Sequence, residues 1–215
     1  MKIRLIGWSA FIGFLTTLAY VSYFTGERPA KDVAYRWDSS LNGLLAYAIF
    51  VGVVMLLTRG LDRRSFLALR RPTSWGVAAR ISILVIIAVA VVSAAVAPFG
   101  SPGKEQGLVL EGFDSHRIAE FAAYAAIVTV VGPIVEELTF RGAGYALLER
   151  FGRTFAVILV GLSFGLIHGL VVGFPVIATF GLGLAYLRSR TASIYPCILL
   201  HACFNAAGLA IGVAG

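Results

Sequence analysis

A pair of glutamates lies inside an apolar segment, in the run GPIVEELTFR that ends at Arg141. Ionisable groups at the centre of a membrane span cost at least about 2.5–3.5 kcal/mol each on insertion scales, so they are rare there and usually functional. On a helix Glu137 and Arg141 share a face, and we expect them to form an ion pair that keeps Glu137 ionised. Glu136 points about 100° away and lacks this partner. A partly desolvated carboxylate without a cationic partner takes up a proton more readily, so we expect Glu136 to be a general base.

Pro133 precedes the two glutamates by one turn. Because proline has no backbone N–H, it frees a carbonyl group or kinks the helix, which indicates a special backbone here. The alternative is a helix end where Glu and Arg reach the membrane interface and do only structural work.

A second polar residue, His168, ends the run FGLIH, with Phe164 one turn earlier on the same helical face. Phe164 could therefore form a wall of the site. Gly161, Gly165 and Gly169 recur every four residues, a pattern that allows close packing of membrane helices. This row of glycines, which we call the glycine seam, would bring His168 near a neighbouring helix.

The third group is His201 and Asn205 in the run HACFN. The two residues share a helical face, and together they can bind a metal ion or donate hydrogen bonds to a developing oxyanion. Packing histidines and an interhelical hydrogen-bonding pair are the structural alternatives. Two of the three histidines of the chain lie in apolar runs, in the half that contains the glutamates. One shared polar site therefore explains the pattern better than three separate packing features.

The three motifs EExxxR, FxxxH and HxxxN, in this order on successive apolar runs, resemble the signature of the CPBP family of CAAX proteases and bacteriocin-processing enzymes, also called the Abi family. The run Phe140-Arg141-Gly142 also fits this pattern, and the resemblance covers residues 117–210. It implies a helical intramembrane endopeptidase that acts on a membrane protein or peptide. Its residue roles are carried over as follows: Glu136 and His168 activate water, His201 and Asn205 stabilise the oxyanion, and Glu137, Arg141 and Phe164 support them. Nothing in the sequence identifies a prenylated substrate.

Members of this family have been described both as metalloproteases and as glutamate-dependent enzymes. The sequence has no HExxH motif, which would place two zinc-binding histidines one turn apart. Glu136, His168 and His201 could still supply the three protein ligands of a Zn²⁺ site. Because Arg141 already offsets negative charge beside the carboxylates, we favour a site without metal or other cofactor, with Zn²⁺ as the alternative.

The elements that must position these residues are membrane helices. The chain is 59% hydrophobic and 13% charged, with a mean hydropathy of +0.87, whereas soluble domains carry about 25% charged residues. A span needs about 20 largely apolar residues. We therefore predict an all-α polytopic bundle of about seven membrane helices, with the site in helices four to seven. The predicted runs are Leu5–Thr25, Leu41–Thr58, Trp75–Pro98, Arg117–Phe140 (continuing as far as Arg150), Thr154–Gly173, Phe174–Leu187 and Ser193–Ala214.

The predicted spans divide into residues 1–116, with helices one to three, and residues 117–215, with helices four to seven, in one integrated bundle. Thirteen of the 18 lysines and arginines fall on the side of the N-terminus. The positive-inside rule then places the N-terminus in the cytoplasm and the C-terminus outside, in the plasma (inner) membrane if the cell is prokaryotic. With the base near the cytoplasmic end of the fourth span, we expect the cavity to be reached from the cytoplasm or laterally from the lipid bilayer.

The sequence also bears on three other functions: nucleic-acid binding, transport and a non-catalytic role. The net charge of +7 comes from short basic clusters between apolar runs, which is the pattern of a topology signal and not of nucleic-acid binding. A transporter or proton relay would also use Glu and His residues, but no internal repeat is visible. A non-catalytic immunity or scaffold protein is the third possibility.

Overall fold

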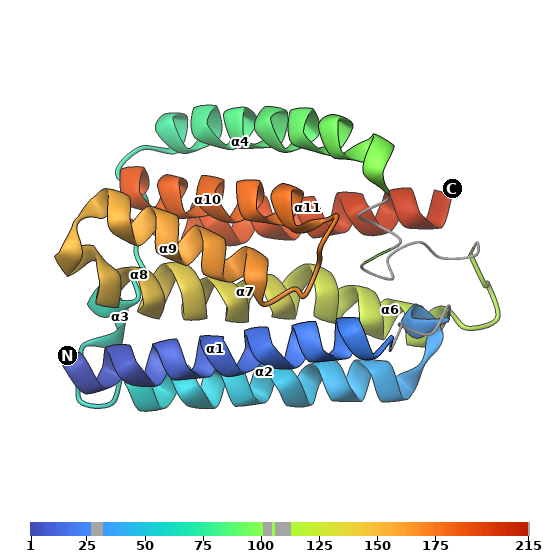
Figure 1. Cartoon of the computed structure of the whole chain (residues 1–215), viewed down its shortest axis with the longest axis horizontal. Helices are drawn as coiled ribbons and strands as arrows, with labels where there is room; N and C mark the ends of the chain where they lie inside the picture. Colours follow the sequence, from blue (N-terminus) through green and yellow to red (C-terminus); the bar gives the residue numbers. More distant parts are fainter. Residues whose placement is uncertain (27–31, 101–104, 106–112, 215) are drawn as a thin grey trace.

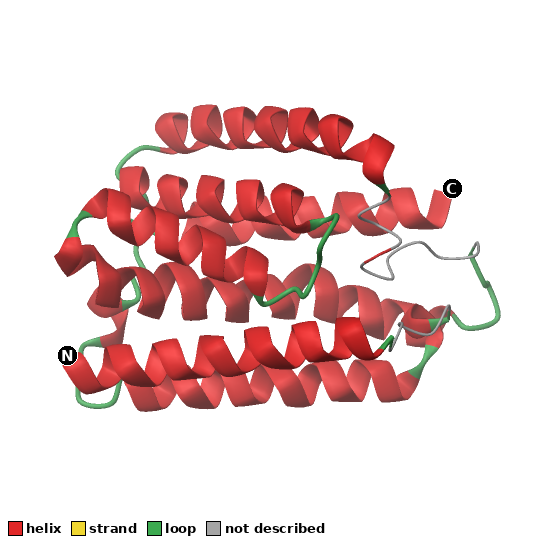
Figure 2. Ribbon diagram, in the orientation of Figure 1, coloured by secondary structure: helices red, strands yellow, loops and turns green. Residues whose placement is uncertain are grey.

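The computed structural model describes residues 1–26, 32–100, 105 and 113–214, and every regular element among them is helical (Figure 2). The glycines and proline of residues 99–116 predict an irregular loop, and most of this segment lies outside the described residues. Seven described helices, which correspond to the seven predicted runs, form one bundle (Figure 1). They are α1 (Lys2–Thr25), α2 (Trp37–Leu57), α4 (Trp75–Val96), the continuous helix from α6 to η5 (Ile118–Phe151), α9 (Arg153–Leu166), α10 (Phe174–Thr191) and α11 (Tyr195–Ala214).

Five of these helices are long and apolar enough to cross a membrane: α1, α2, α4 with its extension to Phe99, the α6–η5 helix and α11. The helix α9 has 14 residues, which is about 21 Å at 1.5 Å per residue, against a hydrocarbon core of about 30 Å. Many large apolar side chains on α1, α2 and α4 are exposed, among them Ile3, Phe14, Leu56 and Leu84. Lipid is the solvent that such a surface requires, so the chain is an integral, multi-pass membrane protein.

The fourth predicted span is one helix of 34 residues, which confirms its continuation past Arg141. It is interrupted by two π-helical segments, η3 (Ile127–Val131) and η4 (Leu138–Gly144), on either side of α7 (Gly132–Glu137). Single π turns inside α-helices are frequent at functional sites because they rotate the side chains that follow. The two glutamates lie in the short α-helical stretch between these turns.

The fifth predicted span, Thr154–Gly173, is too long. The helix α9 ends at Leu166, and His168 lies in the turn that follows, not in mid-helix. Gly169 explains the early end, because its φ of +62° is a left-handed conformation that favours glycine and stops a helix. A Cβ at residue 169 would also lie 2.9 Å from the backbone of Ala19 on α1. The turn is therefore fixed by its own conformation and by close contact with the first helix.

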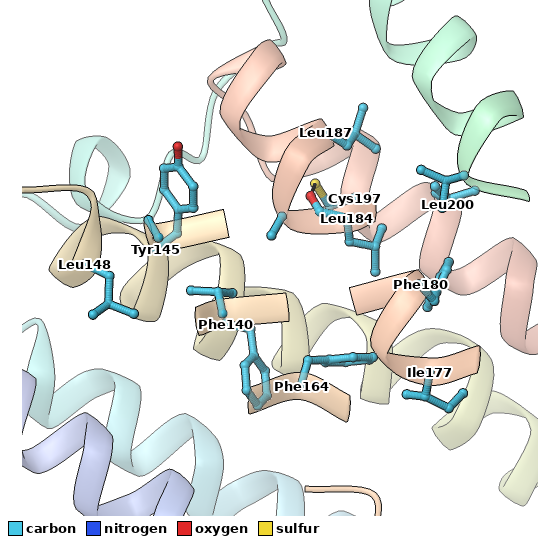
Figure 3. Close-up of a cluster of buried hydrophobic side chains, with 14 of the residues drawn as sticks. Phe140, Tyr145, Leu148, Phe164, Ile177, Phe180, Leu184, Leu187, Cys197 and Leu200 are labelled. Carbon is cyan, nitrogen blue, oxygen red and sulfur yellow. Dashed lines mark hydrogen bonds between the residues drawn. The ribbon is translucent and has the colours of Figure 1, made fainter. Parts of the chain in front are cut away.

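Glycines hold α9 against α10, as the glycine seam predicts. A Cβ on Gly161 would lie 2.6 Å from the Cα of Leu182, and one on Gly165 would lie 3.1 Å from the Cα of Ala178. From the other side, a Cβ on Gly181 would lie 2.4 Å from the carbonyl oxygen of Gly161. Close backbone approach of this kind is how membrane helices associate. Figure 3 shows the buried core around this contact, with Phe140, Phe164, Phe180 and Leu184 among its members.

The two ends of the bundle carry opposite charge. We call the end near Met1 the arginine face, because it holds Lys2, Arg4, Arg59, Arg63, Arg64, Arg70, Arg71, Arg80, Arg150, Arg153, Arg188 and Arg190. The other end, at the start of α2 and α6 (Figure 1), is the acidic face, with Asp32, Asp38, Asp114 and Glu120.

Both described cations of the acidic face are engaged in ion pairs. Arg36 pairs with Asp38 at 2.6 Å, and Arg117 pairs with Asp114 at 2.7 Å and with Asp32 at 3.1 Å. The hydrogen bond from the Arg117 guanidinium holds the pKa of Asp114 below its usual value.

The glycine seam gives the first prediction. Gly161→Ala should lower the thermal unfolding temperature in detergent, because its Cβ meets backbone that cannot move aside, and overpacking of this kind costs about 1–3 kcal/mol. Gly52→Ala on α2 is the matched control, since nothing lies within 4 Å of its added Cβ. Equal unfolding temperatures for the two variants would contradict the close approach of α9 and α10.

Candidate active site

A buried ion pair forms the base of the site. The Nη1 of Arg141 lies 3.0 Å from Oε1 of Glu137, and both side chains are fully buried. The Nη2 of Arg141 also donates to the carbonyl of Gly181 on α10, over 2.9 Å. On the other side, Nδ1 of His201 lies 2.9 Å from the same Glu137 oxygen. The predicted Glu137–Arg141 pair is therefore present, and it joins the fourth helix to α10 and α11.

Phe164 lies at the centre of the polar groups, as its place one turn before His168 predicts. Its ring centroid is 4.4 Å from the guanidinium carbon of Arg141, a cation–π contact. The same ring lies 4.8 Å from the His168 ring and 5.5 Å from the His201 ring. Phe164 is 1% exposed, so its ring is enclosed between these polar side chains.

Glu136 points away from Arg141, as expected, and its two oxygens differ. Oε1 accepts a hydrogen bond of 2.9 Å from the hydroxyl of Tyr47 on α2. Oε2 has no hydrogen-bond partner among the described residues and lies 3.9 Å from Nε2 of His201. One oxygen of Glu136 is thus held by the protein, while the other is free to accept a hydrogen bond from a bound molecule.

Asn205 is held by the special backbone that Pro133 predicts. In the π turn the amide of Gly132 donates to the carbonyl of Ile127, five residues earlier. By the same spacing the carbonyl of Val128 would need an amide at residue 133, and proline has none. Nδ2 of Asn205 donates to this Val128 carbonyl over 2.9 Å. Pro133 therefore frees the group that positions Asn205, and the second hydrogen of Nδ2 remains available.

His168 takes its orientation from the end of α9. Its Nδ1 lies 2.7 Å from the carbonyl oxygen of Phe164, which can only accept, so Nδ1 donates this hydrogen bond. In the neutral ring, Nε2 then carries the lone pair. The turn at Gly169 thus presents a histidine whose free nitrogen can accept a proton or bind a metal.

The predicted site residues meet at one cavity of about 470 Å³. Glu136, His168, His201 and Asn205 line it, together with Phe164, whereas Glu137 and Arg141 lie behind its wall. The remaining lining residues are Ala19, Ser22, Tyr23, Tyr47, Glu105, Tyr124, Val128, Gly169, Leu170, Ile177, Phe180, Phe204 and Gly208. The sequence thus identifies four polar groups of one cavity, on two helices and the turn after α9.

The direction of the cavity differs from the expectation. From Glu136 and His201 it extends toward the ends of α1 and α11 that carry Tyr23 and Gly208, which lie at the acidic face. We expected access from the side of the arginine face or laterally from lipid. The expectation of access from the arginine side is wrong because Glu136 lies in the middle of the 34-residue helix, with more than three further turns between it and the arginine face.

The described side chains do not form a metal site as they stand. No group of three His, Cys, Asp or Glu residues in the described part of the chain has its donor atoms close enough to hold a metal ion. His201 already uses Nδ1 for Glu137, and its Nε2 faces Oε2 of Glu136. Any metal at Glu136, His168 and His201 would require these side chains to move.

Tyr47 is a site residue that the motifs do not identify. It belongs to the second apolar helix, 89 positions before Glu136, and no spacing rule links the two. The signal available in the sequence was a hydroxyl in the middle of a predicted span, where polar groups need partners. Gly132 supports the contact, because a Cβ there would lie 2.5 Å from the Tyr47 hydroxyl.

The buried ion pair gives the second prediction. Arg141→Met should destabilise the protein by about 3–5 kcal/mol, because it leaves Glu137 charged and uncompensated in the interior. Arg153→Met, at the exposed start of α9, is the matched control and should change stability little. Thermal unfolding in detergent measures both. If adding Glu137→Gln to Arg141→Met restored none of the lost stability, the pair would not be the cause.

Comparison with known proteins agrees with this geometry. Residues 118–207 match the family model described as type II CAAX prenyl endopeptidase Rce1-like. Searches of the curated proteins and of the solved structures found no match to this chain. The matched segment contains the seven residues singled out in the sequence, from Glu136 to Asn205, whereas Tyr47 lies outside it. Residues 118–207 of this membrane protein are therefore similar to the Rce1-like type II CAAX prenyl endopeptidases, in agreement with the resemblance that the three motifs carry.

Proposed function

We propose that this protein is an intramembrane endopeptidase that hydrolyses a peptide bond of a membrane-associated or lipid-modified protein or peptide. The family supports a protease that acts on membrane-associated substrates. One observation carries the finer proposal: Glu136, whose Oε2 has no described partner, and His168, whose Nε2 is free, line the same cavity. Two proton acceptors at one cavity are what the activation of a water molecule requires.

In the proposed mechanism Glu136 and His168 each accept a hydrogen bond from one water molecule. Glu136 takes a proton as the water oxygen attacks the scissile carbonyl carbon, and the carbonyl oxygen becomes an oxyanion. The second hydrogen of Asn205 Nδ2 and Nε2–H of His201 donate to that oxyanion. Glu136 then returns its proton to the leaving amine as the C–N bond breaks.

His201 has a specific requirement in this scheme. Its Nδ1 hydrogen bonds to Glu137, so Nε2 carries a hydrogen as well only when the ring is an imidazolium. In this scheme Glu137 holds the Nδ1 side of the ring, and Arg141 bonds to the same Glu137 oxygen. The support pair thus has a chemical role beside its structural one.

We further propose that the reaction needs no metal. The charge of Arg141 beside the two glutamates and the lack of a three-donor group among the described residues support this choice. A Zn²⁺ ion held by Glu136, His168 and His201 is the alternative. For localisation we propose the plasma (inner) membrane if the cell is prokaryotic, and the charge of the arginine face supports a cytoplasmic N-terminus and a C-terminus outside.

The third prediction tests the proton acceptors. Glu136→Gln and His168→Ala should each lower substrate cleavage at least about 100-fold, which is the usual contribution of a general base. Cleavage is measured by expressing each variant with candidate membrane substrates and by comparing the peptides of the membrane fraction by mass spectrometry. Cys203→Ser, an exposed change on α11 outside the cavity, is the control and should keep full activity.

Unchanged processing in both variants would eliminate this mechanism and favour a transporter or a non-catalytic scaffold. A chelator added to the wild type distinguishes the two chemistries. Activity that is lost to the chelator and restored by one stoichiometric metal ion would overturn the metal-free proposal and leave the protease proposal standing.

A further inference from the structure

We infer that the site is reached from the non-cytoplasmic side, so that its substrate is a membrane-anchored polypeptide whose scissile segment lies at the outer surface of the membrane. The substrate class rests on the proposed function, whereas the side of access does not. Two independent features of the described residues carry this inference: the direction of the cavity and the distribution of charge.

The cavity has a closed end and an open end. Its polar end, at Glu136 and His201, lies in the middle of the bundle, and its other end reaches the exposed Tyr23 in the last turn of α1. Toward the arginine face the bundle is filled by fully buried side chains, which Figure 3 shows in part: Phe140, Tyr145, Leu147, Leu184 and Leu187. None of these side chains lines the cavity, so the cavity does not extend into this packed end.

The charge of the two faces sets the orientation. Among the described residues, the twelve basic side chains of the arginine face stand against Arg36 and Arg117 at the acidic face. Segments rich in lysine and arginine are retained in the cytoplasm, and acidic residues have little influence on topology. Arg36 and Arg117 are moreover neutralised by Asp38, Asp32 and Asp114. The arginine face is therefore cytoplasmic, and the open end of the cavity is outside.

This placement has a consequence for the substrate. A polypeptide tail on the cytoplasmic surface would have to pass the packed end of the bundle to reach Glu136. A polypeptide that is anchored in the membrane and exposed outside can enter between the acidic-face ends of α1 and α11 instead. The peptide-bond hydrolysis proposed above is then directed at proteins on the non-cytoplasmic side of the membrane.

The fourth prediction uses cysteine labelling in whole cells. In a Cys203→Ser background, where the remaining Cys197 is buried, Gly208→Cys places a thiol at the open end of the cavity. A charged, membrane-impermeant maleimide should label it in intact cells. Gly76→Cys, at the start of α4 on the arginine face, is the matched control and should be labelled in inverted vesicles alone. Both sites have space for a side chain. A Cβ added to Gly208 has no atom within 4 Å, and a Cβ added to Gly76 lies 3.7 Å from the Ser74 hydroxyl.

Labelling of Gly208→Cys in inverted vesicles alone would overturn the inference, as would failure to label it from either side, since the open end must be in contact with water. Once a substrate is known, labelling from outside should also block its cleavage. If the wild type cleaves no substrate, the proposed function fails, but the labelling pattern still decides the side of access.

We also propose that Tyr47 is a positioning residue for Glu136. Its hydroxyl donates to Oε1, and this bond leaves Oε2 as the oxygen directed at His201 and the cavity. The ring is fixed by an edge contact with Phe50 at 6.1 Å, and Gly132 leaves space for the hydroxyl. A glutamate without this bond could rotate and present either oxygen, or neither, to the water. The catalytic segment thus depends on a residue outside the family match.

The fifth prediction is that Tyr47→Phe lowers kcat about tenfold to hundredfold with KM unchanged, because one hydrogen bond to a charged group is lost and the ring is retained. Tyr145→Phe is the control, since that buried phenol lies outside the cavity, and both variants should unfold at the wild-type temperature.

A second readout does not need a substrate. The infrared carboxylate band of Glu136, identified by its loss in Glu136→Gln, should shift in Tyr47→Phe and stay unchanged in Tyr145→Phe. An unshifted band or wild-type kcat in Tyr47→Phe would show that Tyr47 only packs.

Discussion

The carboxylate of Glu137 is the point on which the other interactions of the site depend. A charge that is fully buried in a membrane protein must be compensated on every side, and here Arg141 and His201 share one of its oxygens. Arg141 then extends to the Gly181 carbonyl and covers the Phe164 ring. Through these contacts a single ionised group fixes the relative position of the fourth helix, α9, α10 and α11. The side chains proposed to act on the substrate are held by this arrangement and do not themselves hold the bundle together.

Irregular backbone supplies the second constraint. Two π turns, a proline and a left-handed glycine occur within the matched segment, and each frees or aims a polar group at the cavity. Pro133 leaves the Val128 carbonyl for Asn205, and the end of α9 leaves the Phe164 carbonyl for His168. In the membrane interior an unpaired carbonyl is costly, so a side chain that bonds to it is held firmly. Departures from ideal helix geometry are therefore what makes the site precise.

Much of this arrangement could be predicted from local spacing. The Glu137–Arg141 pair, the separate direction of Glu136, the continuation of the fourth helix and the glycine seam all follow from helical periodicity, which acts over a few residues. The predictions that were missed or wrong concern contacts between helices and the direction of the cavity, which helical periodicity does not determine. Tyr47 reaches Glu136 from another helix, His168 lies beyond a helix that Gly169 ends early, and the cavity extends toward the face opposite to the one expected. Each of these depends on how helices stack in three dimensions, and neither hydropathy nor motif order specifies that.

The short helix α9 has a consequence for hydration. Because it ends at Leu166, the chain turns back at residues 167–173, and the amides at the end of this turn bond to a side chain instead of to helical carbonyls. Glu105 accepts hydrogen bonds from the amides of Val171, Val172 and Gly173. Non-helical backbone at such a depth is tolerated where it borders protein or a water-filled space. The turn that shortens α9 also borders the cavity through Gly169 and Leu170, and a hydrolase in a membrane consumes one water molecule for every bond it breaks.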